Sequence, residues 1–472
     1  MTKYSMFAFV ICIALSWAKL EGQTPCPTGV ASDKLVCLIP QVYGVNGLEA
    51  KNPDPNATAG NFAFKFLTGS LSSLESAIAR QAALLPLASP SSGVTFTWDA
   101  SSKVFVASTG SYGPILSDRA ETIGKYKVFL GFDYQYFKFS SLDGQSLKTL
   151  PVVLPQDDFP LNDGSGTICS INGTTPAQNT GNCGFIRDVI ITQNRVDLKI
   201  HQFTTFITFG LTNRIELSAA IPIENVRTSM VSTVTIEHND SPTRFVHAFA
   251  VRPDCPAVCL TNTFSNTGSA SGIGDITVRV KATAWKGERA GLALGSDVRL
   301  PTGDSLNYLG VGAPGAKPFV IWSYTSRIEP HAFVGYEMNG SSVVAGDILA
   351  GKKDKVPGQL TYSAGADMLV KKNISVAVDL VGQQIFQARR TIPTTFTEPG
   401  ACNNLSCSST AFPRMDANLS QTVGTFNITS ISLGAKAKPV ASLLITGNAL
   451  VKLNQGGLRS TVIPLLGVSY TF

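Results

Sequence analysis

The order of short and long connections between patterned segments constrains this chain more than any other feature of its sequence. From about residue 125 to the last residue, segments of roughly 10–14 residues place apolar side chains on one face and polar side chains on the other, as strands do. The short connections are Leu211–Arg214, Lys286–Glu288, Thr325–Ser326, Lys371–Asn373 and Lys436–Pro439. The others are 141–194, 238–273, 301–316, 339–358, 388–422 and the brief Asn454–Gly457.

Short and long connections alternate strictly, which is typical of a membrane barrel with tight periplasmic turns and long external loops. The sequence therefore predicts an all-β fold, a transmembrane antiparallel β-barrel of about 12 strands. An even number of strands places both ends of the barrel on the periplasmic side. A soluble two-sheet protein with a solvated polar face is the alternative interpretation.

The composition agrees with a barrel and excludes other classes. Charged residues make up only 15% of the chain, against about 25% in soluble proteins. The long apolar run, Met6–Leu15, is too short for the roughly 20 residues of a membrane-spanning helix. The net charge of +6 is mild, and no basic cluster is interleaved with aromatic residues. We therefore expect no nucleic-acid partner.

The N-terminus reads as a secretory signal peptide over residues 1–22. Lys3 supplies the positive charge, an apolar stretch follows, and Ala18 or Gly22 precedes the cleavage site. Export through a cleaved signal peptide places the predicted barrel in the cell outer membrane.

A small N-terminal region, residues 23–120, precedes the barrel, residues 121–472. Apolar residues at helical spacing predict a helix over 69–87, and two short apolar runs predict a hairpin over 94–107. We expect this helix-plus-hairpin region to lie on the periplasmic side or to plug the bore.

Eight cysteines remain after signal removal, in four pairs that are local in the sequence and lie in polar, turn-rich stretches. An even number in an exported chain predicts disulfides. Zinc is the alternative for the last two pairs, but no histidine is near them. The cysteines are Cys26, Cys37, Cys169, Cys183, Cys255, Cys259, Cys402 and Cys407.

Charged residues on the predicted inner face have both signs, which predicts a water-containing lumen crossed by ion pairs. The predicted pore-lining residues are Lys199, Arg279, Lys281, Asp297, Arg299, Glu329 and Asp304. The apolar phase shifts near Gln202, which suggests a bulge, and Pro222 suggests a bend at the barrel rim.

The last segment alternates up to an aromatic terminus, with Tyr470 and Phe472 on one face. This pattern resembles the signal by which the barrel assembly machinery recognises its substrates. Outer-membrane lipid is the other expected macromolecular environment.

No catalytic motif is present. The chain lacks a nucleophile elbow, a phosphate-binding glycine loop and a zinc-protease motif, and its four histidines are scattered. Acidic loop residues such as Asp157 and Asp163 match no calcium-loop spacing. We expect no enzyme activity, no cofactor and no metal.

Several motifs, in order, resemble the outer-membrane transporter family named after the meta-pathway of phenol degradation. They are Gly113–Gly124, Leu130–Phe137, Leu142–Gly144, Phe209–Pro222, Arg299–Asp304, Tyr308–Gly310, Gly335–Glu337 and Asn339–Gly340. The resemblance covers roughly residues 110–472 and implies a β-barrel that passes small molecules across the outer membrane. It also implies that Arg299 and Asp304 shape the pore, with a structural turn as the alternative. The channel family for long-chain fatty acids and hydrocarbons is the neighbouring possibility, but none of its motifs is found here.

Two functions follow as hypotheses. The first is a passive channel for small solutes, which include aromatic or hydrophobic compounds. The second is a structural or adhesive barrel whose disulfide-stapled external loops bind a partner.

Overall fold

A computed structural model of the chain describes residues 25–27, 29–50, 64–66, 69–82, 96–99, 104–107, 111–155, 159–160, 168–169, 188–238, 247–256, 258–397, 402–403, 406–407, 415–440 and 442–472. The predicted signal peptide lies outside these residues. Twelve strands form a closed barrel: β5 (Val128–Leu142), β10 (Val189–Gly210), β11 (Ile215–Glu237), β13 (Ile276–Lys286), β14 (Ala290–Leu300), β15 (Gly315–Tyr324), β16 (Ile328–Asn339), β19 (Gln359–Lys371), β20 (Ile374–Thr397), β23 (Met415–Val440), β24 (Leu443–Lys452) and β26 (Val462–Thr471).

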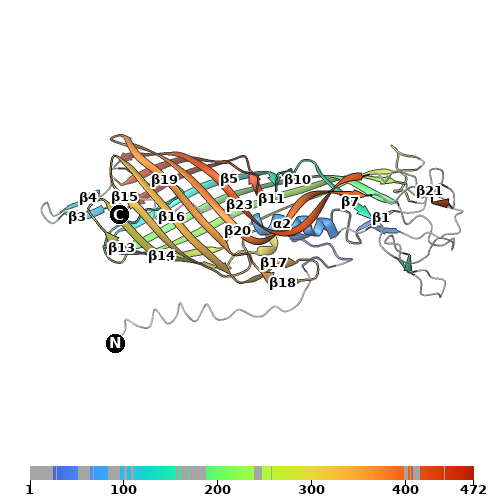
Figure 1. The fold of residues 1–472 in the computed structure, drawn as a ribbon, viewed down its shortest axis with the longest axis horizontal. Helices are drawn as coiled ribbons and strands as arrows, with labels where there is room; N and C mark the ends of the chain where they lie inside the picture. The colour runs from blue at the N-terminus through green and yellow to red at the C-terminus, as the bar shows by residue number, and fades with distance from the viewer. Residues whose placement is uncertain are drawn as a thin grey trace, which may run out of the picture.

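Each barrel strand pairs antiparallel with the next one along the chain, and the sheet closes on itself where β26 pairs with β5. Closure leaves the barrel wall without an unpaired edge, as a lipid environment demands. The predicted all-β transmembrane barrel of twelve strands is confirmed (Figure 1).

The two ends of the barrel differ. The end with the short connections, called the turn end below, also carries the C-terminus (Figure 1). The opposite end, called the loop end, carries the long connections. One predicted turn was misplaced: Lys436–Pro439 lies inside β23, which pairs onward to Val440, and β24 begins at Leu443.

Short helices and strands accompany the twelve barrel strands. The predicted helix is α2 (Gly69–Ala82), and the predicted hairpin is β3 (Phe96–Asp99) with β4 (Val104–Ala107). No described helix is long and apolar enough to cross a membrane. The other elements are η1 (Leu35–Cys37), β1 (Leu48–Ala50), β2 (Phe64–Phe66), β6 (Gln145–Ser146), β7 (Leu150–Pro155), β8 (Phe159–Pro160), β9 (Ile168–Cys169), β12 (Thr261–Ile273), η2 (Ser305–Asn307), β17 (Ser341–Asp347), β18 (Lys352–Lys355), β21 (Cys402–Asn403), β22 (Ser406–Cys407) and β25 (Leu458–Ser460).

Strand β10 shows how the surroundings of the wall change along the barrel. Near the turn end, Phe203 and Ile207 are exposed on its outer face while Thr204 is buried on the inner face. Near the loop end the polarity reverses, because Leu198 and Ile200 are buried inside. The expected bulge near Gln202 is absent, since β10 and β11 pair without a register shift. The change in apolar phase marks the level at which the outer face passes from lipid to water.

Several strands continue past the apolar band at the loop end. There β7 and β12 pair with β10 and β11, so that a four-stranded wall extends the barrel. Pro222 lies where the partner of β11 changes from β13 to β12, a position that tolerates a missing N–H group. The expected loop 388–422 is mostly strand, because β20 runs to Thr397 and β23 begins at Met415.

Candidate functional site: the filled lumen

A chain segment without regular structure, Ser111–Gly124, fills the lumen at the turn end. Its positive-φ glycines, Gly113 and Gly124, allow sharp changes of direction that other residues resist. The side chains between them are almost all buried, including Ile115 and Ala120. The segment, called the gate segment below, connects the N-terminal region to β5.

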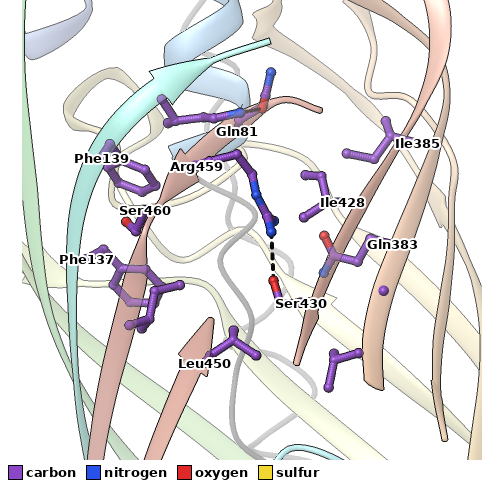
Figure 2. A pocket seen from close by; sticks show the side chains of 14 residues that line it. Gln81, Phe137, Phe139, Gln383, Ile385, Ile428, Ser430, Leu450, Arg459 and Ser460 are labelled. Atoms are coloured by element: carbon purple, nitrogen blue, oxygen red, sulfur yellow. Dashed lines mark hydrogen bonds between the residues drawn. The ribbon is translucent and has the colours of Figure 1, made fainter. Parts of the chain in front are cut away.

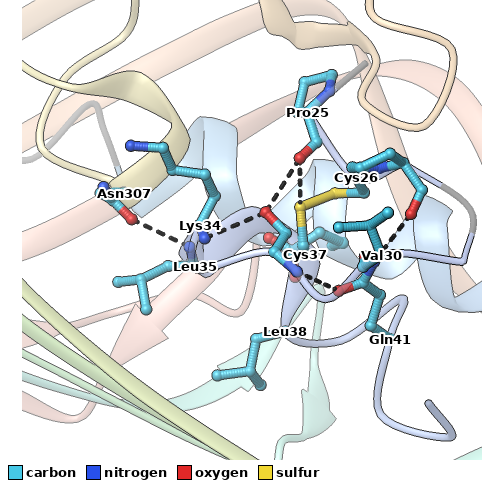
Figure 3. The surroundings of a disulfide bond; sticks show 12 residues. Pro25, Cys26, Val30, Lys34, Leu35, Cys37, Leu38, Gln41 and Asn307 are labelled. Carbon is cyan, nitrogen blue, oxygen red and sulfur yellow. Dashed lines mark hydrogen bonds between the residues drawn. A yellow bond between two sulfur atoms is a disulfide. The ribbon is translucent and has the colours of Figure 1, made fainter. Parts of the chain in front are cut away.

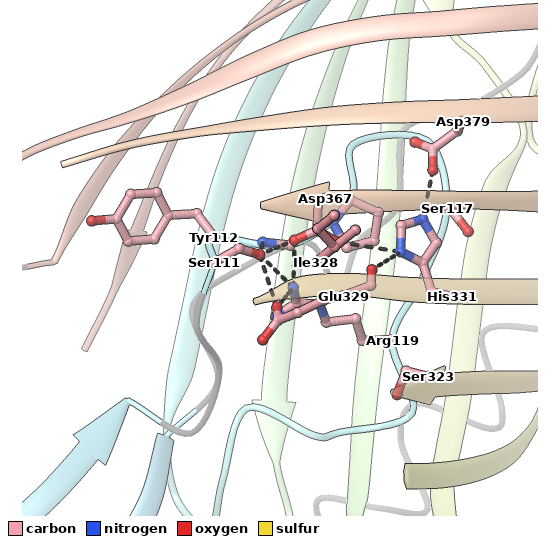
Figure 4. A network of polar contacts seen from close by, with 12 residues as sticks. Ser111, Tyr112, Ser117, Arg119, Ser323, Ile328, Glu329, His331, Asp367 and Asp379 are labelled. Carbon is pink, nitrogen blue, oxygen red and sulfur yellow. Dashed lines mark hydrogen bonds and ion pairs between the residues drawn. The ribbon is translucent and has the colours of Figure 1, made fainter. Parts of the chain in front are cut away.

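One ion-pair cluster fastens the gate segment to strands β16 and β19. The Arg119 guanidinium contacts the carboxylates of Glu329 and Asp367, and Ser111 hydrogen-bonds to both acids (Figure 4). The side chains of Arg119, Glu329 and Asp367 are only 5%, 4% and 0% exposed. His331 extends the cluster to Asp379, because its Nδ1 lies 3.2 Å from Asp367 Oδ1 and its Nε2 lies 2.5 Å from Asp379 Oδ1.

A second cluster binds the gate segment to β13 and β14. Arg279 bridges Asp118 of the segment and Asp297 of β14, with its Nε 2.6 Å from Asp297 Oδ1. Lys317 adds a further cation 3.1 Å from Asp297 Oδ2. The Arg279 guanidinium also lies 4.8 Å from the ring centre of Phe319.

Two buried lysines bind backbone carbonyls of the gate segment from different parts of the wall. Lys281 Nζ donates to the carbonyls of Arg119 (3.0 Å) and Glu121 (2.9 Å) and pairs with Glu216 at 2.8 Å. Lys436 Nζ donates to the carbonyls of Tyr112 (3.1 Å) and Pro114 (2.7 Å). These contacts to the gate segment are polar, and Ile115, Ile123 and Ala120 of the segment also pack in apolar clusters with the wall.

The predicted pore residues divide into three groups. Arg279, Lys281, Asp297, Arg299 and Glu329 all lie on the inner face of the barrel, where each is buried or half-buried in ion pairs. Asp304 lies outside the wall strands. It caps η2 by accepting a hydrogen bond from Leu306 N and pairs with Lys34 at 3.1 Å.

The prediction for Lys199 was wrong. This residue shares the outer face of β10 with Phe203 and pairs with Asp197 at 3.2 Å. In the strand register it stands beside Lys138 of β5 and Arg227 of β11, just beyond the apolar band. The inversion of polarity along β10 caused the error, because polar residues face inward near the turn end and outward near the loop end.

The N-terminal region fills the loop half of the barrel with an apolar core. Leu71, Leu74 and Ile78 of α2 are at most 1% exposed and pack in one cluster with inner residues of β11 such as Met230. The cluster also includes Leu35, whose backbone N donates to Asn307 Oδ1 of η2 at 3.1 Å (Figure 3).

The apolar core of the N-terminal region contains a buried acid, Glu75 of α2. Glu75 is fully buried and contacts the hydroxyl of Tyr308. Burial raises the pKa of Glu75 to about 8, although the hydrogen bond to Tyr308 opposes the shift. Glu75 is therefore mostly neutral at pH 7.

At the loop end, the carboxylate of Asp188 contacts the imidazoles of two histidines. Asp188 Oδ2 lies 2.9 Å from His238 Nδ1 and 2.7 Å from His247 Nδ1. Burial by itself raises the pKa of Asp188, but the two histidines outweigh burial and hold this pKa at about 2. Across the described ranges, no group of three or more His, Cys, Asp or Glu side chains could hold a metal ion.

Two predicted disulfides are present, Cys26–Cys37 in the N-terminal region (Figure 3) and Cys255–Cys259 at the loop end. In the β21–β22 hairpin, Cys402 is the register partner of Cys407. The structure does not describe their side chains, nor that of Cys169, and Cys183 lies outside the described residues. The pairings Cys169–Cys183 and Cys402–Cys407 remain predictions.

A cavity remains inside the barrel. Its volume is about 730 Å³, including the part that is open to solvent. Inner-face residues of β5, β20, β23 and β24 line it together with Gln81 of α2, and Arg459 of β25 projects into it (Figure 2).

The fold and the lumen define a transmembrane β-barrel of the outer-membrane type. Residues 204–389 match the model of a family described as "Putative MetA-pathway of phenol degradation". The match begins in β10 and ends in β20, and it confirms the family resemblance of the sequence over this part of the chain.

Two solved structures show a partial likeness to the chain. An outer membrane channel from Pseudomonas putida F1 is 11% identical over 75% of this chain and 99% of its own, with a TM-score of 0.41. A FadL homologue from Pseudomonas aeruginosa is 11% identical over 75% of this chain and 91% of its own, with a TM-score of 0.29. No curated protein matches the sequence.

Sequence reasoning missed the gate segment's role. Asp118 and Arg119 lie within a motif that carried the family resemblance, but nothing in the motif showed where it would lie. The available signal was an adjacent pair of opposite charges in an otherwise apolar and small-residue stretch, a pattern that is costly to bury without partners.

Proposed function

We propose that the protein is a passive outer-membrane channel for small solutes, with the gate segment as its displaceable closure. One observation carries the proposal: the segment that fills the lumen at the turn end has no regular structure and is held by ion pairs and hydrogen bonds as well as by apolar contacts of Ile115, Ile123 and Ala120. A hydrogen bond to the wall can be exchanged for one to water at a small net cost, whereas breaking a buried ion pair costs more. A solute concentration gradient would drive the flow.

The orientation follows from the two ends of the barrel. The turn end faces the periplasm and the loop end faces outward, as in outer-membrane barrels generally. In this view residues 23–120 form a plug region that extends into the gate segment, and residues 1–22 are removed on export. Tyr470 and Phe472, whose rings lie 4.6 Å apart near the C-terminus, serve recognition by the assembly machinery. No catalytic role is proposed.

A reversible lock tests whether the gate segment must move. Ser117 of the segment and Ser363 of β19 face each other, with 2.7 Å between their hydroxyl oxygens. Cysteines at both positions, S117C/S363C, should form a disulfide across this contact. In planar bilayers we expect stepwise conductance from the reduced variant and a silent or strongly reduced channel after oxidation.

The single variant S117C under the same oxidation and reduction is the matched control, because it reports any effect of the native disulfides. A conductance that is identical in the locked and reduced forms would show that solutes pass without movement of the gate segment. Absence of current from every folded form would refute the channel.

The loop-end extension favours a second candidate, an adhesive barrel. Strand β12 and the distal part of β23 lie beyond the apolar band and present largely polar, partly exposed side chains. Shortening the connection between Thr397 and Met415 discriminates between the two functions. A binder loses its partner, whereas a channel keeps its conductance.

A further inference from the structure

Several buried cations among the described barrel residues contact carboxylates, and Arg459 differs from these. Arg119, Arg279 and Lys281 each contact at least one carboxylate. Arg459 is only 5% exposed, yet no carboxylate of the described residues lies within ion-pair distance of it. Burying an uncompensated charge is costly, so a counter-charge is expected at this position.

Among the described residues, the hydrogen bonds of Arg459 all come from its Nη2. Its Nη2 donates to the carbonyl of Thr429 at 2.7 Å and to Ser430 Oγ at 2.8 Å (Figure 2). Its Nε is buried and has no hydrogen-bond partner among the described residues, and the same holds for the neighbouring Ser460 Oγ. A guanidinium offers five N–H donors in a fixed fork that fits a carboxylate.

The rest of the cavity is mainly apolar. Phe137 and Phe139 of β5 line one side, and Ile385 of β20 and Leu450 of β24 line others (Figure 2). Ile463 of β26 is a further apolar lining residue. The site therefore combines one cation with an apolar enclosure, the arrangement typical of small-molecule pockets with a single polar anchor.

We propose that this cavity binds a small organic carboxylate with an apolar body, such as an aromatic acid, and that Arg459 binds its carboxylate. A neutral apolar solute would leave the guanidinium without a counter-charge, and an inorganic anion would leave the apolar walls unused. The proposal deepens the channel function and rests on it only for the route by which the ligand reaches the cavity.

Fluorine NMR titrations of the purified protein in detergent test the proposal. The probes are 4-fluorobenzoate and its uncharged analogue 4-fluorobenzyl alcohol. We expect saturable binding of the acid and binding of the alcohol at least about tenfold weaker, because charge-assisted hydrogen bonds are lost. This comparison needs no variant, so it does not depend on the folding of a mutant.

The substitution R459Q should weaken benzoate binding about tenfold or more, and R459K should keep part of it. The matched control is R389Q, since Arg389 lies on β20 outside the cavity lining and pairs with Asp354 at 3.5 Å. Heat-dependent gel mobility verifies that each variant is a folded barrel.

Three outcomes would overturn the site: no saturable benzoate binding, equal affinity for the acid and the alcohol, or an unchanged dissociation constant in R459Q. Equal losses in R459Q and R389Q would likewise refute it, since net charge would then explain the binding. A conducting protein that fails these titrations refutes the pocket alone. A protein that binds benzoate but conducts no current refutes the channel alone.

Discussion

Removing the Arg119 side chain should release the gate segment from the lumen. In R119M, the carboxylates of Glu329 and Asp367 stay buried next to each other without the cation that now contacts both. Breaking a buried ion pair from one side costs about 3–5 kcal/mol. At about 1.4 kcal/mol per tenfold change, the undocked fraction of the segment should rise roughly 100-fold to several thousand-fold.

A thiol in the gate segment measures this fraction. Ser117 is 2% exposed, and in an S117C background its labelling by a water-soluble maleimide reports how often the segment leaves the lumen. We expect R119M to accelerate labelling by the factor above. The chain without S117C, labelled in parallel, gives the background from its other cysteines.

Two variants test whether the loss of the ion pairs, and not a general disturbance of the fold, accelerates the labelling. The triple variant R119M/E329Q/D367N removes all three charges, and it should label nearly as slowly as the S117C parent, because a neutral replacement of a buried pair is close to neutral in stability. R214M removes an exposed arginine in the turn between β10 and β11 and should have no effect. Unchanged labelling in R119M, or a triple variant as fast as R119M, would refute the reasoning.

Three further predictions follow from the structure. Because the pKa of Glu75 is raised from 4.5 to about 8 in the fold, the folded state holds a proton that the unfolded chain loses, so stability should fall as pH rises from about 4.5 to about 8, by up to roughly 1.4 kcal/mol per unit. E75Q should flatten this dependence in urea unfolding followed by gel mobility, and a dependence that persists in E75Q would contradict the assignment. K199E should leave ion selectivity in bilayers unchanged because Lys199 faces outward. A shifted reversal potential would show instead that Lys199 lines the lumen. Deleting Phe472 should slow assembly of the folded barrel in cells without changing the conductance of assembled protein, and normal assembly would argue against a terminal signal.

The barrel wall was predictable because its information is local. Alternation of side chains needs only neighbouring residues, so the outer placement of Tyr134 and the inner placement of Arg279 and Glu329 could be inferred from the sequence. The strand count followed in the same way, since each connection interrupts the alternation. One error, at 388–422, arose where strands continue past the membrane, because polar outer residues there look like loop. Another was the turn predicted at Lys436–Pro439, which lies inside β23.

Lys199 shows the limit of the local argument. Alternation fixes which side chains share a face, but it does not say whether lipid, water or protein lies against that face. On β10 the surroundings reverse within one continuous strand. A rule that assigned charged residues to the lumen was therefore right for Lys281 and wrong for Lys199.

The sequence by itself determined a closed antiparallel barrel with an apolar outer band, since a period of two residues and alternating connection lengths admit few other folds. Only the tertiary structure decided what fills the barrel. The gate segment has no periodicity, and Arg119 meets Glu329 and Asp367 across 210 and 248 residues of sequence. The same holds for the surroundings of Arg459, because only the three-dimensional packing shows that no carboxylate of the described residues lies next to its guanidinium.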